Sequence, residues 1–104
     1  MKIEITSKNL DLTAPIRTYI QDKLGNIERL IGKMDMEEGG ELQLKMTIER
    51  ATAHHHKGEV FRAAADLVLP KKNLHAQEFN KDIRIAIDAV RTKLAAEVKK
   101  YKEK

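Results

Sequence analysis

The chain has 104 residues, of which 41% are hydrophobic and 35% charged, a composition typical of one globular domain with a net charge of +4. It holds no cysteine, which excludes disulfides, thiolate nucleophiles and cysteine-bound zinc, and no apolar run reaches the ~20 residues that span a bilayer. The N-terminus alternates polar and apolar residues, unlike a signal peptide. We therefore expect a single domain over residues 1–104 in a cytoplasmic protein.

The first predicted elements are a short strand and the start of a helix. Residues 2–7 alternate polar and apolar side chains and place Ile3 and Ile5 on one side, as in a strand with one buried face. Thr13 suits a helix N-cap, and Pro15 falls in the first turn, where its missing N–H costs nothing. A helix is therefore expected to begin directly after Thr13.

An apolar stripe at helical spacing predicts one amphipathic helix that ends at Gly32, a residue typical of a helix C-terminus. The stripe consists of Ile16, Ile20, Leu24, Ile27 and Ile31. Gly25 lies inside it and costs about 1 kcal/mol relative to alanine, which favours a close contact or a kink at this point. Residues 33–41 are polar and contain a Gly-Gly pair, so they are expected to form a connection.

Two alternating segments predict a β-hairpin. In the first, the apolar positions are Leu42, Leu44, Met46 and Ile48, and the polar ones are Gln43, Lys45, Thr47 and Glu49. In the second, the core-facing positions are Phe61, Ala63, Ala65, Leu67 and Leu69. Residues 51–58 form the predicted turn, residues 70–73 a second turn, and residues 74–77 a short fourth strand.

The last predicted element is a helix that begins after Asn80 or Asp82, either of which suits an N-cap. Its apolar stripe is formed by Ile83, Ile87, Val90, Leu94, Val98 and Tyr101. The predicted order is β-α-β-β-β-α, an α+β fold. Because a four-stranded sheet with one apolar face needs a cover, both helices are expected to pack on that face. The other face would stay open and carry Gln43, Lys45, Thr47, Glu49 and Arg62.

The chain offers little for catalysis. Three adjacent histidines, His54 to His56, point to alternate sides of an extended chain, whereas zinc ligands usually lie about two to four residues apart. The Gly-Gly pair lacks the lysine of a phosphate loop, and no serine lies in a nucleophile elbow. We therefore expect no enzyme activity, no catalytic residue, no metal site and no cofactor. A metal-dependent enzyme that uses the three histidines is the catalytic alternative.

Stacking of bases on aromatic side chains is also not favoured. Of the four aromatic residues, Phe61 and Tyr101 fall on predicted core stripes, and the others are Tyr19 and Phe79. The alternation of the strands places no aromatic residue on the open face of the sheet. An RNA partner would therefore be recognised through its backbone and its shape.

The basic residues gather in the last helix, where residues 91–104 hold six Lys or Arg against two acidic residues. On a helical wheel, one flank of the apolar stripe carries Lys93, Lys100 and Lys104, and the other carries Arg84, Arg91 and Lys102. Two interpretations remain open on charge alone. The lysines either solvate a helix end near its negative dipole or form a surface that binds a polyanion.

Three stretches of the chain resemble a known family. They are Ile5-Thr6, Leu12-Thr13-Ala14, Tyr19-Ile20, Lys23-Leu24 and Leu30; then Leu74-His75-Ala76; and finally Asp82, Ala86-Ile87-Asp88, Lys93-Leu94, Lys100, Lys102 and Lys104. At this spacing the chain resembles, over essentially its whole length, the bacterial ribosome hibernation promoting factors, also called ribosome-associated inhibitors or sigma-54 modulation proteins. The family's fold is the six-element order given above and is similar to double-stranded RNA-binding domains.

The resemblance implies a stress or stationary-phase protein that binds the small ribosomal subunit and represses translation. Family members occupy the channel of the mRNA and of the A- and P-site tRNAs, so the implied partner is rRNA, with no membrane and no small-molecule substrate. The implied rRNA contacts are Lys93, Lys100, Lys102 and Lys104, joined by Arg84, Arg91, Lys45 and Arg62 as further candidates. The protein is expected to be monomeric off the ribosome and to have no C-terminal dimerisation domain.

Three positions depart from the family pattern. Arg84 stands where an aromatic residue is usual, Ala96 where a basic residue often lies, and Glu97 where a glutamine is common, so the individual rRNA contacts are expected to differ. Two other functions remain as alternatives: a general module for duplex RNA and a regulator that binds another protein. Whether the chain promotes ribosome dimers or silences single ribosomes is left open by its residues.

Overall fold

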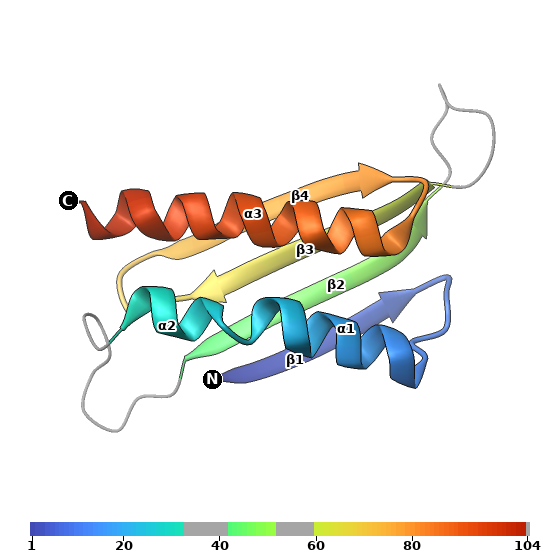
Figure 1. Cartoon of the computed structure of the whole chain (residues 1–104), viewed down its shortest axis with the longest axis horizontal. Coiled ribbons are helices and arrows are strands. Elements are labelled where there is room, and N and C mark those ends of the chain that lie inside the picture. Colours follow the sequence, from blue (N-terminus) through green and yellow to red (C-terminus); the bar gives the residue numbers. More distant parts are fainter. Residues whose placement is uncertain (33–41, 52–59, 104) are drawn as a thin grey trace.

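A computed structural model describes residues 1–32, 42–51 and 60–103 of the chain. The elements along the chain are β1 (Lys2–Lys8), α1 (Ala14–Leu24), α2 (Ile27–Ile31), β2 (Gln43–Ala51), β3 (Val60–Val68), β4 (Asn73–Asn80) and α3 (Ile83–Lys102) (Figure 1). The predicted α+β class and the predicted order of elements are confirmed. The connection predicted at residues 33–41 and most of the turn predicted at residues 51–58 lie outside the described residues.

The four strands form one mixed sheet in the order β1-β2-β3-β4. Strand β1 pairs with β2 in parallel, and the pairs β2–β3 and β3–β4 are antiparallel, as the hairpin prediction requires. The helices lie side by side on one face of this sheet (Figure 1). The expected two-layer arrangement, with an open face on the far side of the sheet, is therefore confirmed.

The first predicted helix is interrupted in the structure. Helix α1 ends at Leu24 and α2 begins at Ile27, with Gly25 and Asn26 between them. A Cβ atom at Gly25 would lie 2.5 Å from the carbonyl oxygen of Gln21, so a larger residue there requires the backbone to shift. The break changes the direction of the chain while Leu24 and Ile27 both stay fully buried. Of the two roles suggested for this glycine, the structure shows both a kink and a close contact.

The predicted helix ends agree with the caps in the structure. The Thr13 hydroxyl accepts the N–H of Ile16 at 3.4 Å and begins α1. Gly32 ends α2 with a φ of +66°, which is a left-handed conformation that favours glycine. Asp82, rather than Asn80, is the N-cap of α3 and accepts the N–H of Arg84 at 2.9 Å. Asn80 instead accepts the N–H of Asp82.

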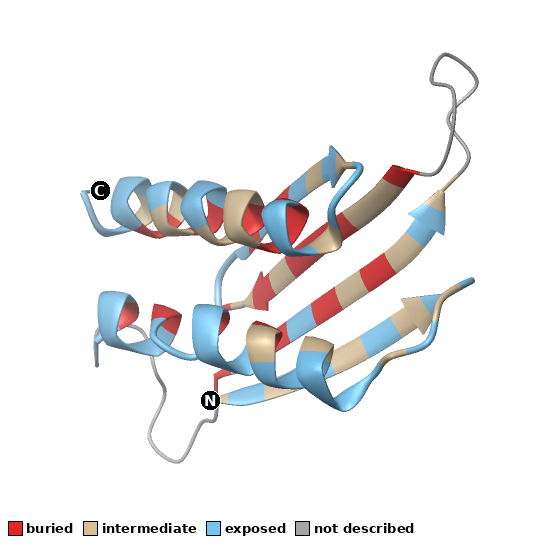
Figure 2. Cartoon of the chain, turned by 45° about the vertical axis from the view of Figure 1, so that its right-hand side comes forward, coloured by how far each residue is buried: buried red, intermediate tan, exposed pale blue. Residues whose placement is uncertain are grey.

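The core lies between the sheet and the helices, and buried positions alternate along β2 (Figure 2). Helix α3 packs on β3 and β4, and α1 and α2 contact its flank. The core side chains of α3 are Ala86, Ile87, Val90, Leu94 and Val98. Small residues of β3 and β4 under this helix, Ala63, Ala65 and Ala76, let α3 approach the sheet closely. The buried stripe of α3 therefore follows the predicted periodicity.

Two aromatic residues differ from the prediction. Strand β4 extends to Asn80, so Phe79 lies opposite Arg62 on the open face and is 48% exposed, although no aromatic residue was expected there. Phe61 is only partly buried and does not join the core cluster. It lies near the end of β3, where the Arg50 guanidinium is 5.9 Å from its ring centre. Tyr101 packs against the core as predicted.

Candidate nucleic-acid interface

The two faces of the molecule differ in charge. The three helices carry nine Lys or Arg and four Asp or Glu within their bounds. On the open face of the sheet, four basic residues stand beside three carboxylates: Lys2, Lys8, Lys45 and Arg62, with Glu4, Glu49 and Asp66. A polyanion is attracted to the side with the larger local excess of positive charge. The helical side is therefore the stronger candidate surface.

On the open face, Arg62 is engaged by its neighbours. Its Nη1 lies 3.1 Å from Oε1 of Glu49, and its Nε donates to Oε1 of Gln77 at 3.2 Å. The Arg62 and Glu49 side chains are each only about a quarter exposed, so the pair lies flat on the sheet. Lys45 lies two rows away, between Glu4 and Asp66 in register. Lys45 and Arg62, the two candidate rRNA contacts on the sheet, thus both lie beside carboxylates.

A cluster at the seam between α1 and α3 holds Arg84. The Tyr19 hydroxyl donates to both carboxylate oxygens of Asp88, at 2.7 and 2.9 Å. The Arg84 guanidinium and the Lys23 ammonium lie 5.5 and 5.4 Å from the centre of the Tyr19 ring, within range of cation–π attraction. The hydrogen bond to Asp88, followed by burial, raises the pKa of Tyr19 above its usual value. Tyr19 therefore positions Arg84 and Lys23, a role that the sequence patterns did not predict.

Arg91 lies on the same side of α3, in a groove between α1 and α3. Its Nη2 donates to the side-chain oxygen of Asn26 at 3.3 Å, directly at the break between α1 and α2. The groove has a volume of about 480 Å³ and is lined by Asp22, Lys23, Asn26, Asp88, Arg91 and Thr92. Arg84 and Arg91 are thus both held at this seam by contacts that long-range folding creates.

The four lysines implied by the resemblance have different surroundings. Lys93 lies 2.6 Å from Oε2 of Glu78 on β4 and donates to the carbonyl of Gln77 at 3.3 Å. The hydrogen bond from Lys93 lowers the pKa of Glu78. Lys100 is 73% exposed and lies 3.9 Å from Glu97, one turn away. Lys104 lies outside the described residues.

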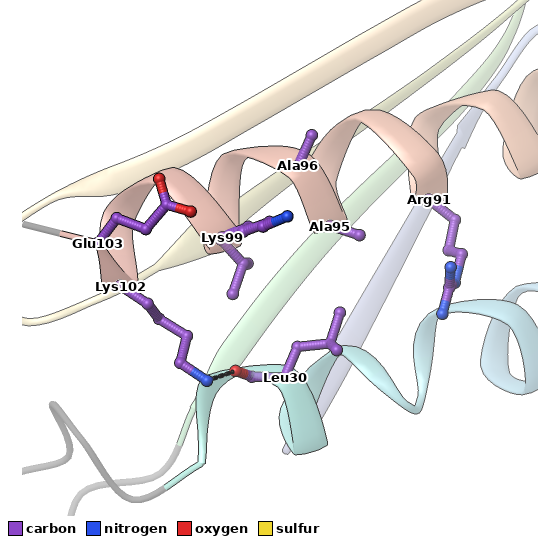
Figure 3. A pocket seen from close by; sticks show the side chains of 8 residues that line it. Leu30, Arg91, Ala95, Ala96, Lys99, Lys102 and Glu103 are labelled. Atoms are coloured by element: carbon purple, nitrogen blue, oxygen red, sulfur yellow. Dashed lines mark hydrogen bonds between the residues drawn. The ribbon is translucent and has the colours of Figure 1, made fainter.

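Lys102 is tied to the neighbouring helix. Its ammonium donates to the carbonyl of Leu30 near the C-terminal end of α2 at 2.7 Å (Figure 3). A lysine ammonium has three N–H donors, so beside these partners Lys93 keeps one donor and Lys102 keeps two for a phosphate. Their intramolecular partners nevertheless give both lysines a structural role that sequence spacing does not reveal. The exposed Lys99, on the same turn as Lys102, was not among the predicted contacts.

Among the described residues, no group of three or more His, Asp or Glu is placed to hold a metal ion. The three adjacent histidines lie outside those residues. In the part of the chain that the structure describes, no helix is long and apolar enough to cross a membrane.

Fold and charge together define the class: a small α+β domain whose helical side carries an excess of positive charge suited to a polyanion. Residues 3–104 match the family described as Sigma 54 modulation protein / S30EA ribosomal protein. The chain belongs to this family, so the resemblance found in the sequence is confirmed.

The chain is also similar to named relatives and to a solved structure. The chain is 29% identical to a "Ribosome hibernation promotion factor" of Lactococcus lactis subsp. cremoris and 31% identical to one of Staphylococcus aureus. Each match covers 98% of this chain but only 50% and 48% of the relative, so the chain spans about half the length of these proteins. The crystal structure of the Thermus thermophilus Protein Y N-terminal domain superposes with a TM-score of 0.77 at 27% identity, covering 97% of this chain and 99% of that one.

Proposed function

We propose that this protein is a ribosome hibernation factor that binds the small ribosomal subunit and represses translation under stress or in stationary phase. The observation that carries the proposal is the family match over residues 3–104, supported by relatives that are named ribosome hibernation promotion factors. The site of binding is the channel that holds the mRNA and the A- and P-site tRNAs. Repression is by occupancy, and no bond is made or broken.

The helical side provides the main contact with rRNA in this proposal. Arg84, Arg91 and Lys100 reach phosphates directly, and Lys93 and Lys102 use the donors that their intramolecular partners leave free. Lys104, which lies outside the described residues, is a further contact that the family resemblance implies. Neutralised phosphates release their counterions, which makes the binding tight at low salt and weak at high salt.

The open face of the sheet is a secondary contact. A channel encloses its occupant, so Lys45 and Arg62 can meet rRNA on the side opposite the helices. Because Arg62 already pairs with Glu49, its contribution is smaller than that of an unpaired arginine. The proposal therefore ranks the helical side above the sheet.

Co-sedimentation of the purified protein with ribosomes and with separated subunits, across a salt series, tests the proposal. The expected result is salt-sensitive binding to the small subunit that mRNA and tRNA together displace. Absence of binding at low salt would contradict it. Equal affinity for ribosomes and naked duplex RNA would instead support the general RNA-binding alternative, and binding insensitive to salt and nuclease a protein partner.

A further inference from the structure

A hollow of about 480 Å³ lies between α2 and the C-terminal half of α3 (Figure 3). Its walls are mostly apolar, and four residues supply them: Leu30, Ala95, Ala96 and Val98. Its rim is charged and consists of Arg91, Lys99, Lys102 and Glu103. The volume falls within the range of roughly 300–1,000 Å³ that is usual for small-molecule sites. The hollow therefore has the size and the polarity of a binding site for part of a ligand.

The hollow is formed before any ligand binds, because its two ends are fixed. At one end the Lys102 ammonium is bonded to the Leu30 carbonyl at 2.7 Å, and at the other the Arg91 guanidinium is bonded to Asn26 at 3.3 Å. Two alanines stand on the α3 side, so no long side chain fills the space. The Leu30 side chain, which points toward α3 in Figure 3, is 37% exposed although it is apolar. A preformed apolar surface loses little entropy when a ligand covers it.

We propose that this hollow takes one unstacked nucleotide of single-stranded RNA, an inference that rests on the proposed function and deepens it. The base covers the apolar wall between Leu30 and Val98, and the adjoining phosphates lie at the cations of the rim. Three basic residues against one carboxylate give the rim a net positive charge, which complements the phosphates on either side of a base. Recognition of splayed bases in loops and ends is how sequence-specific RNA binding generally works.

The rim also indicates which bases fit. Glu103 contributes a carboxylate, which accepts hydrogen bonds and therefore favours bases with an exocyclic amino group, namely adenine, cytosine and guanine. Uracil has no such group. An acidic peptide, the other ligand that a basic rim attracts, would be repelled by Glu103 and would offer it no donor from its own carboxylates. The observations thus favour an adenosine, cytidine or guanosine over uridine.

The test uses three RNA octamers and the unchanged protein. One octamer is all uridine, the second has a single central adenosine, and the third has an abasic unit in that place. Affinity is measured by fluorescence anisotropy at low salt, and the methyl resonances of leucine, valine and alanine are followed by NMR. We expect the adenosine octamer to bind at least about five-fold more tightly than the abasic one, and to shift the methyl signals of Leu30, Ala95 and Val98.

Two variants separate the hollow from general electrostatics. Ala95→Leu fills the hollow without a change of charge and keeps a good helix former, so it should abolish the difference between adenosine and abasic octamers. Ala14→Leu makes the same change at an exposed position of α1 and should leave the difference intact. Circular dichroism confirms the helix content of both variants.

Two results would overturn the inference. In the first, the adenosine and abasic octamers bind equally and the three methyl signals do not move. In the second, a leucine-containing, glutamate-rich peptide displaces the RNA from those methyl groups, which would assign the hollow to a protein segment. Neither result would contradict the proposed function, because co-sedimentation with ribosomes tests that function separately.

Discussion

Tyr19 of α1 and Asp88 of α3 are joined by a hydrogen bond in which the hydroxyl contacts both carboxylate oxygens, at 2.7 and 2.9 Å, although 69 residues separate them in sequence. Lys23 and Arg84 lie against the ring of the same tyrosine. The bond therefore clamps two helices together where they present two cations. One side-chain pair thus contributes both to stability and to the placement of Arg84.

Replacement of Tyr19 by phenylalanine should lower the free energy of unfolding by about 1 kcal/mol, because Asp88 loses a donor at a partly buried site. Urea denaturation measures the change. A double-mutant cycle with Asp88→Ala should be non-additive. Additive effects of the two single substitutions would show that the pair is not coupled.

The same pair predicts an alkaline pH dependence. The pKa of Tyr19 is raised above 10.0 in the folded protein, chiefly by the hydrogen bond to Asp88, so its contribution to stability is complete below pH 10. It is lost as the pH rises through the folded-state pKa, since tyrosinate would face the carboxylate. The stability advantage of wild type over Tyr19→Phe should therefore shrink above pH 10. A constant difference in thermal midpoint across this range would contradict the prediction.

The pair Lys93–Glu78 predicts an effect at acid pH. The hydrogen bond from Lys93 lowers the pKa of Glu78 below 4.5, so the pair stabilises the fold above that pH and its contribution is lost as the pH falls through the folded-state pKa. Glu78→Gln should make stability less dependent on pH in this acid range, as measured by thermal unfolding. Glu4→Gln, an exposed substitution on β1, is the control and should retain the part of the pH dependence that the Lys93–Glu78 pair contributes.

Lys102 and Lys100 should separate structural from binding roles. Lys102→Gln removes the bond to the Leu30 carbonyl and should cost about 0.5–1.5 kcal/mol of stability, whereas Lys100→Gln should change stability by less than about 0.5 kcal/mol. Both substitutions should weaken ribosome binding. Equal thermal stability of the two variants would mean that the hydrogen bond from Lys102 to the Leu30 carbonyl contributes nothing to stability.

Charge removal on the two faces should have unequal effects on ribosome binding. A triple variant of the helical side, Arg84→Gln, Arg91→Gln and Lys100→Gln, should reduce the slope of log affinity against log salt by about two to three units. The matched variant of the open face, Lys2→Gln, Lys8→Gln and Lys45→Gln, removes the same charge and should have a smaller effect. Equal slopes for the two variants would exclude a preferred face. Circular dichroism should show that both remain folded.

Much of the fold follows from local patterns in the chain. The apolar periodicity of α3 and the alternation of β2, and of β3 apart from Phe61, predict buried faces that the structure confirms, because burial of apolar surface dominates the choice. The Thr13 cap and the left-handed Gly32 are likewise local, since each depends on the conformation of its own few residues. The family resemblance was likewise identified from the sequence alone.

Those local patterns do not predict which partners a side chain contacts. Phe79 reaches the open face because β4 continues in register with β3 beyond residue 77, and register depends on pairing with a distant strand. A helical wheel puts Lys93 and Lys102 on opposite flanks of α3 but does not show that β4 and α2 supply a partner for each. The break at Gly25 separates α2 from α1, and Leu30 of α2 then lines one wall of the hollow. Periodicity determines which way a side chain faces, whereas what it meets depends on elements that only tertiary packing brings together.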